Sequence, residues 1–114
     1  MASSTLPFLR GTLDVLILRT LSGGPLHGYD LSRRIGELSR SAFHVEEGVL
    51  YPALRRLENR GWLQATWGQT ETGREARFYE ITPAGRRHLK AQLAMWERYV
   101  HAMSLVLYPE TAES

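Results

Sequence analysis

The sequence predicts a mainly α (α+β) fold in a single domain, residues 1–114. Three segments with apolar residues at helical spacing come first, and two strand-like segments follow at residues 62–81. A further helical pattern then runs without a breaker to about residue 108. This order is typical of a winged helix-turn-helix domain with a two-stranded wing and a long C-terminal dimerisation helix. The parts are the winged portion with its N-terminal helix (residues 11–81), the dimerisation helix (82–108) and a tail (109–114).

The first helix is expected to begin at Gly11 or Thr12, because Pro7 stops a helix from extending far upstream. Its residues are apolar nearly all round, which indicates burial on more than one side. A domain this small struggles to surround its own helix, so part of the surface is expected to meet another subunit. The residues assigned to that contact are Leu13, Leu16 and Ile17.

A second helix is expected from about His27 to Leu38, after a turn at residues 22–25. Gly28 costs about 1 kcal/mol of helix stability relative to alanine, and we expect it to allow a neighbouring backbone to approach closely. Arg33 and Arg34 point away from the apolar stripe, where they are either solvated or in contact with DNA phosphates. The sequence leaves both interpretations open.

The third helix is expected to begin near Glu47 or Gly48 and to end at Gly61, which tolerates the left-handed conformation of a helix C-cap. Pro52 has no N–H group and therefore fits best in the first turn. One face is an apolar stripe, whereas the opposite face combines an aromatic hydroxyl, two guanidinium groups and an amide. The stripe is Leu50, Ala53, Leu54 and Leu57, and the opposite face is Gly48, Tyr51, Pro52, Arg55, Arg56 and Asn59.

This outer face has two interpretations. A lone helix of this kind is usually an ordinary amphipathic helix with a solvated charged face. A helix followed at once by a strand hairpin is instead typical of a DNA-reading helix. Angular position favours Arg55 for base edges, with Tyr51 second, and leaves open which side chains contact bases and which contact phosphates.

The hairpin is expected to have strands at residues 62–67 and 76–81 and a long polar tip between them. Arg74 and Arg77 lie at or near this wing, placed to reach phosphates or an adjacent minor groove. Glu71 and Glu75 oppose this interpretation, and the alternative is a solvated hairpin without DNA contacts.

The last helix is expected to have Thr82 as its N-cap and Pro83 at its first position, and to continue to about Tyr108. Roughly 25 residues at about 1.5 Å each make it longer than the small core can cover. A heptad-like seam along it predicts a dimer interface, and a second apolar line lies beside the seam. The seam is Leu89, Leu93, Trp96, Val100, Met103 and Leu107, and the second line is Met95, Tyr99, Ala102 and Val106.

Composition excludes several classes of protein. The chain has no cysteine, which excludes disulfides and thiolate metal sites, and its formal net charge is only +2. Its basic residues are arginine except for Lys90; arginine suits phosphate and guanine, but the same bias arises from a GC-rich genome. We find no secretion signal and no transmembrane segment, so a cytoplasmic location without membrane contact is expected.

No metal site, cofactor or catalytic centre is predicted. Four histidines are scattered along the chain, and only Glu97 and His101 have the i,i+4 spacing of a ligand pair on a helix. Two ligands without a third do not make a zinc site. There is no nucleophile elbow, phosphate-cradling glycine motif or paired-carboxylate spacing, so the chain is not expected to be an enzyme.

Three blocks of sequence resemble the PadR-like family of transcriptional regulators. They are GPLHGYDL (Gly24–Leu31), EEGVLYPALRRLENRGWL (Glu46–Leu63) and RFYEITPAGRRHL (Arg77–Leu89). The length is similar to that of small members with one long C-terminal helix.

The resemblance implies a homodimer that binds double-stranded DNA at an inverted-repeat operator and represses transcription. It implies that Gly48, Tyr51 and Arg55 lie on the recognition helix, and Arg74 and Arg77 in the wing. The wing departs from the family pattern, since Glu75 and Ala76 replace basic residues at its tip. Many members respond to small aromatic or drug-like compounds. This property varies within the family, and the matching motifs do not predict it. The alternatives are a winged-helix protein-interaction module without DNA binding and a repressor without a ligand.

Trp96 has two interpretations on the dimerisation helix. It either fills the dimer core or, with its symmetry mate, flanks a central cavity where a flat aromatic effector stacks. The residues assigned to this pocket are Phe8, Met95, Trp96, Val100 and Met103.

Overall fold

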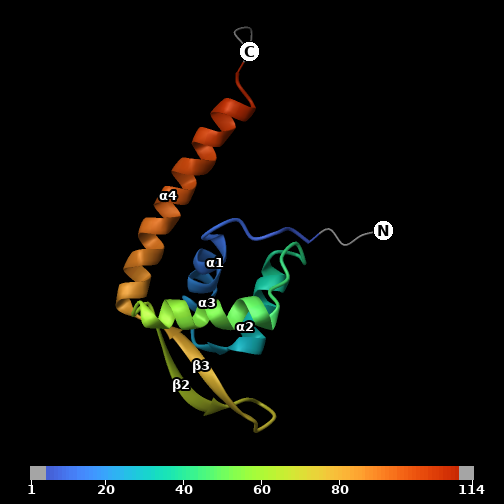
Figure 1. Cartoon of the computed structure of the whole chain (residues 1–114), viewed down its shortest axis with the longest axis vertical. Coiled ribbons are helices and arrows are strands. Elements are labelled where there is room, and N and C mark those ends of the chain that lie inside the picture. The colour runs from blue at the N-terminus through green and yellow to red at the C-terminus, as the bar shows by residue number, and fades with distance from the viewer. Residues whose placement is uncertain (1–4, 111–114) are drawn as a thin grey trace.

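The computed structural model describes residues 5–110 and arranges them as a helical body, a projecting hairpin and a projecting helix (Figure 1). The helical body contains α1, α2 and α3, and a three-stranded antiparallel sheet lies against it. The elements are α1 (Thr12–Leu21), β1 (Leu26–His27), α2 (Gly28–Leu38), α3 (Glu47–Asn59), β2 (Leu63–Gln69), β3 (Glu75–Ile81) and α4 (Pro83–Leu107).

The core lies where the inward stripes of the three body helices meet one face of the sheet. Ile17 of α1, Leu31 of α2 and Leu54 of α3 are each fully buried there. Tyr79 and Ile81 of β3 close the core from the sheet side. Burial of these apolar side chains holds α3 rigidly, because its inward stripe is enclosed while its outer face stays exposed.

The C-terminus of α3 ends as expected from the sequence. Gly61 has φ 80°, and its N–H donates to the Glu58 carbonyl, while the Trp62 N–H donates to the Leu57 carbonyl. These two bonds form a Schellman motif, which satisfies the last carbonyls of the helix and turns the chain into β2. The position of Pro52 was predicted wrongly: it lies inside the helix, one turn beyond its start, which leaves the Gly48 carbonyl without an intrahelical donor.

The sheet has the strand order β1-β3-β2, and β1 was not predicted. β1 contains two residues, too few for an alternating pattern to identify it, and it pairs Leu26 with Tyr79. The hairpin strands are longer at the tip than expected, since β2 continues to Gln69 and β3 begins at Glu75. β2 crosses Gly68 without a break because the ring of Phe78 covers that glycine.

The junction between the hairpin and α4 is tightly bonded. Thr82 caps α4: its hydroxyl accepts from the Gly85 N–H at 3.0 Å and donates to the Gly61 carbonyl at 2.6 Å. Gly85 cannot be larger, since a Cβ there would lie 2.2 Å from the Trp62 carbonyl oxygen. The predicted cap is therefore confirmed, and the same contacts anchor α4 to the end of α3.

Only the start of α4 packs on the body. Leu89 is its last buried side chain, Leu93 is half-buried, and every residue from Ala94 to Leu107 is exposed. The helix projects away from α1 and gives the molecule its 63 Å long dimension (Figure 1). No helix between residues 5 and 110 combines the length and apolar character needed to cross a membrane.

Three residues assigned to a subunit interface need correction. Leu13, Ile17 and Leu89 are buried within the chain, with 7 %, 0 % and 6 % of their surface exposed. α1 packs against α2, α3, β3 and α4 of its own chain, so these residues have little surface to offer a second subunit. Leu16 is half-buried.

Candidate nucleic-acid interface

The outer face of α3 separates into a ridge and two flanks. Gly48, Pro52, Arg55 and Asn59 form the ridge directly opposite the buried stripe, and all four are exposed. The Arg55 side chain forms no hydrogen bond or ion pair with any residue between 5 and 110. Its guanidinium is therefore free to bind a partner outside the chain.

Gly48 stands on this ridge without a structural reason inside the chain. A Cβ added to it would meet nothing within 4 Å, and its backbone conformation is ordinary. The close packing that explains Gly28 and Gly85 is therefore absent here. The smooth surface at the start of the ridge suits an external partner that comes close to the helix backbone.

Tyr51 occupies the flank of α3 that faces the first turn of α2. A Cβ on Gly28 would lie 2.3 Å from the Tyr51 hydroxyl oxygen, so a larger residue at position 28 would force the Tyr51 ring to move. The expectation that Gly28 admits a neighbouring backbone was wrong, because the neighbour is this side chain. Tyr51 is 42 % exposed, and its contact with α2 fixes the direction of its ring.

Arg56 lies on the opposite flank, toward α1. Its guanidinium pairs with the Asp14 carboxylate, which joins α3 to α1. Arg56 was grouped with Arg55 as a DNA-binding residue, but the two differ. Arg56 is committed to an intramolecular ion pair, whereas Arg55 is not.

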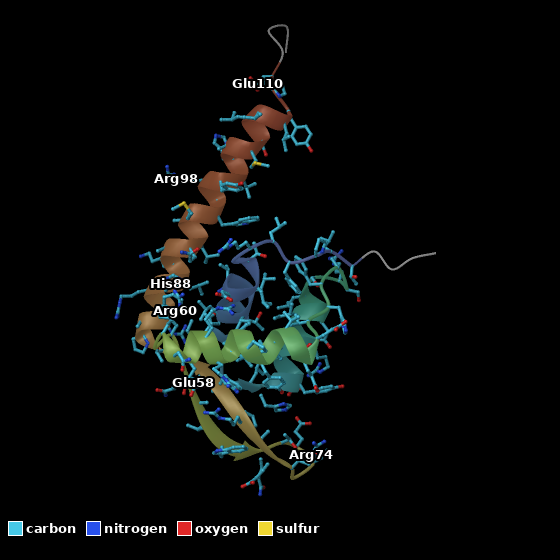
Figure 2. All side chains as sticks on the ribbon, viewed as in Figure 1. Glu58, Arg60, Arg74, His88, Arg98 and Glu110 are labelled. Atoms are coloured by element: carbon cyan, nitrogen blue, oxygen red, sulfur yellow. The ribbon has the colours of Figure 1, made fainter. Side chains whose placement is uncertain are left out.

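The two wing arginines differ in the same way. Arg77 donates to Glu58 of α3 at 3.1 Å, and its guanidinium lies 5.8 Å from the centre of the Tyr79 ring. Arg74 lies at the hairpin tip, where its backbone is bonded to Thr70 and its guanidinium has no partner among residues 5–110 (Figure 2). Arg77 thus ties the wing to α3, and Arg74 is the cation that the wing presents outward.

The arginines of α2 also divide into paired and unpaired. Arg33 bonds Asp30 at 3.1 Å and Glu37 at 2.7 Å, and these two carboxylates raise its pKa. Arg34 has no ion pair in the described part of the chain and is exposed. Of the two, Arg34 is the one free to bind a phosphate.

Sequence reasoning missed a cluster that joins the end of α3 to α4. The rings of Trp62 and His88 stack with centroids 3.5 Å apart, and Arg60 lies 5.3 Å from the Trp62 ring centre (Figure 2). Burial lowers the pKa of His88, and the positive charge of Arg60 lowers it further, while Asp14 opposes the shift. The stacking partners are 26 positions apart, so spacing in the sequence could not reveal them.

The exposed part of α4 carries the remaining predicted residues. Trp96, Val100, Met103 and Leu107 are between 41 % and 56 % exposed, although all are apolar. Trp96 stacks loosely on Tyr99, with ring centroids 6.5 Å apart. Met95 is also exposed, so the predicted seam and pocket residues of α4 from Met95 to Leu107 form one apolar surface.

Phe8 is not joined to the α4 residues with which it was grouped. Its ring stacks on Phe43, with centroids 5.0 Å apart, and packs against the body core.

A separate open groove of about 490 Å³ lies between α1 and the start of α4. Its floor is Leu89, Leu93 and Ala94, and its charged rim is Arg19, Arg86, Lys90 and Glu97. Within residues 5–110, no group of three or more histidine, aspartate or glutamate side chains is placed to hold a metal ion.

Comparison with known proteins identifies the family. The model of the transcriptional regulator PadR-like family matches residues 17–91, a span from α1 into α4 that includes the whole of α3 and the wing. The chain belongs to this family. The resemblance carried by its sequence blocks is thereby confirmed.

Individual relatives agree with this assignment. A transcriptional regulator of Mycobacterium tuberculosis is 39 % identical over 82 residues, which cover 72 % of this chain and 73 % of that protein. The solved structure of a transcriptional regulator from Clostridium thermocellum is 30 % identical, with a TM-score of 0.75 over 89 % of this chain and 96 % of that one. A PadR-like transcriptional regulator from Bacillus cereus has a TM-score of 0.77 at 26 % identity, over 90 % of this chain and 97 % of that one. The winged-helix architecture and membership of a family of transcriptional regulators follow from these matches.

Proposed function

We propose that this PadR-like regulator is a homodimeric repressor that binds an inverted-repeat operator in double-stranded DNA. The observation that carries the proposal is the separation of paired from unpaired cations. The guanidinium groups of Arg55 on the ridge of α3 and Arg74 at the wing tip have no partner among residues 5–110, whereas those of Arg56 and Arg77 are paired with Asp14 and Glu58. A free cation on the exposed face of α3 and another at the tip of the projecting wing suit a polyanion.

In this proposal, α3 enters the major groove with Gly48 closest to the DNA. The absence of a side chain at Gly48 lets the backbone of the helix approach the bases. Arg55 then reaches a base edge, because a guanidinium can bind guanine with two hydrogen bonds. Arg74 binds the DNA backbone beside the adjacent minor groove.

The exposed apolar surface of α4 supports the dimer. A helix of 25 residues with most of its apolar side chains uncovered is unfavourable in water, and a second copy of α4 covers the same surface by symmetry. Such a dimer presents two α3 helices related by a two-fold axis. The operator is therefore expected to consist of two inverted half-sites separated by about one or two helical turns.

The proposal includes release of the repressor from DNA by a small aromatic effector. Trp96 and Tyr99 are exposed aromatic residues on the surface assigned to the dimer, and Met95 and Met103 beside them adapt readily to ligand shape. Titration of planar aromatic compounds into the protein should quench tryptophan fluorescence. The quenching should be lost in Trp96→Ala; equal quenching in that variant would contradict a ligand site at Trp96.

The DNA-binding proposal is tested by selection of duplexes from a random library, followed by affinity measurements at several salt concentrations. We expect an enriched inverted repeat and an affinity that falls steeply with salt, because phosphate contacts release counterions. A chain that enriches no duplex and shows no salt-dependent binding at low ionic strength would instead be a protein-interaction module.

A further inference from the structure

Trp67 on the wing is a large apolar side chain that the fold does not use. It is 68 % exposed, the highest value among the tryptophans. Trp62 is covered by His88, and Trp96 belongs to the apolar surface of α4. Trp67 lies near the end of β2, beyond the last core residue of that strand, so its exposed ring contributes little to folding.

The strand register shows which way Trp67 faces. Trp67 pairs with Arg77, and paired residues in an antiparallel sheet place their side chains on the same face. Arg77 bonds Glu58 of α3, so this face is the one turned toward α3. Trp67 therefore lies on the face of the wing that is turned toward α3, nearer the hairpin tip than Ala65.

Two arginines whose guanidinium groups have no ion pair among residues 5–110 flank this face of the wing. Arg55 stands on the α3 side and Arg74 at the wing tip, and the charge of Arg55 already acts on Tyr79 within the same face. A partner that binds against this face must therefore satisfy positive charge and also cover an indole ring. The sugar–phosphate backbone of DNA offers both an anion and the apolar face of deoxyribose.

The path of the DNA past this face follows from the proposed function, on which this inference rests. If α3 occupies the major groove and the wing tip the neighbouring minor groove, the DNA strand that separates the two grooves passes between them. We propose that Trp67 packs its ring on a deoxyribose of this strand and donates its indole N–H to a phosphate oxygen. The indole N–H is a donor only, which suits an anionic oxygen, and the ring is flat and apolar.

The test compares Trp67→Ala and Trp67→Phe with Thr66→Ala. Thr66 is the preceding residue, exposed on the opposite face of the same strand, and serves as a matched control. On the duplex selected by the wild-type protein, Trp67→Ala should bind about tenfold more weakly, since it loses an apolar contact and a hydrogen bond to a charged group. The affinity of Trp67→Phe should lie between those of the wild type and Trp67→Ala, and Thr66→Ala should bind as the wild type does.

Salt dependence separates this contact from a cationic one. Trp67 is uncharged and displaces no counterion from DNA when it binds. The slope of log affinity against log salt should therefore stay unchanged in both Trp67 variants. Arg74→Ala should reduce the slope by about 0.9, the value expected for one phosphate contact. Thermal unfolding of each variant should match the wild type because the three side chains are exposed.

Two results would overturn the inference. Wild-type affinity in Trp67→Ala would show that the ring does not contact DNA, while the proposed function would stand. A change in oligomeric state in Trp67→Ala, measured by sedimentation, would show that the ring belongs to a protein interface. Failure of the wild-type protein itself to bind any duplex would instead remove the proposed function, together with the inference that rests on it.

Discussion

The winged body and the outer half of α4 use apolar residues in opposite ways. In the body, the inward stripes of α1, α2 and α3 are almost fully enclosed, and ion pairs such as Arg56–Asp14 join the helices around them. In α4, the apolar residues beyond Leu93 are exposed on a helix that projects from the body (Figure 1). The body completes its own core, whereas α4 needs a second surface to cover it. The following predictions test this difference.

The largest effect is expected from a charge placed on the exposed apolar surface of α4. Val100→Asp should weaken the proposed dimer at least about 100-fold, because burial of an unpaired carboxylate costs several kcal/mol. The measurement is sedimentation equilibrium over a range of protein concentrations. Arg98→Ala, which lies off the predicted seam, is the control and should leave the dimer intact. A Val100→Asp protein that remains dimeric at the same concentrations would place the interface elsewhere.

The next effect distinguishes free from committed arginines in the body. Arg55→Ala should weaken binding to the selected duplex by about 1–3 kcal/mol if Arg55 reads a base. Arg56→Ala should act mainly on stability, since it removes the ion pair with Asp14 that joins α3 to α1. Binding isotherms and chemical denaturation of both variants provide the comparison. Equal losses of DNA affinity in the two variants would refute the division between the ridge of α3 and the flank that faces α1.

Substitutions of Gly48 and Gly85 test whether each glycine is required by packing within the chain or by an external partner. Gly48→Ala should stabilise the fold by up to about 1 kcal/mol, because alanine is the better helix former and the site is open. The same change should weaken DNA binding if α3 approaches the groove at that point. Gly85→Ala should destabilise the fold, since its Cβ would meet the Trp62 carbonyl. Urea denaturation measures both, and a destabilised Gly48→Ala protein would contradict the open site.

The smallest effect concerns the junction between the two regions. The pKa of His88 is lowered from its usual 6.5 by burial and by Arg60, so the folded state binds this proton less readily than the unfolded state does. The free energy of unfolding should therefore decrease as the pH falls through and below 6.5, and increase again as the pH rises. In His88→Phe, which keeps a ring against Trp62, this dependence should be shallower. Parallel curves of unfolding free energy against pH for the two proteins would show that His88 does not contribute to the pH dependence of stability.

Local patterns predicted most of the fold. The bounds of α1, α2 and α3 lie within one or two residues of those expected, because glycine, proline and apolar spacing act over a few positions. Thr82 and Pro83 likewise specified the start of α4. β1 escaped prediction because two residues carry no periodicity, and it exists only through its pairing with β3.

The residues of the candidate site were predicted, but not which of its arginines form ion pairs within the chain. The outer face of α3 was identified from angular position, and the structure leaves Gly48, Arg55 and Asn59 exposed on it. Angular position could not distinguish Arg55 from Arg56, because that difference depends on Asp14, which lies 42 positions away from Arg56. The same holds for Arg77, whose partner Glu58 belongs to another element.

The sequence by itself determined the order and type of the elements, the family to which the chain belongs, and the apolar surface of a helix too long for its own core. These features depend on interactions between near neighbours and on blocks of residues that can be recognised in order. Only the tertiary structure decided which arginines are free, why Gly28 must face Tyr51, and that Trp67 shares a face with Arg77. Such properties arise when segments far apart in the chain are brought into contact, and spacing along the chain does not record those contacts.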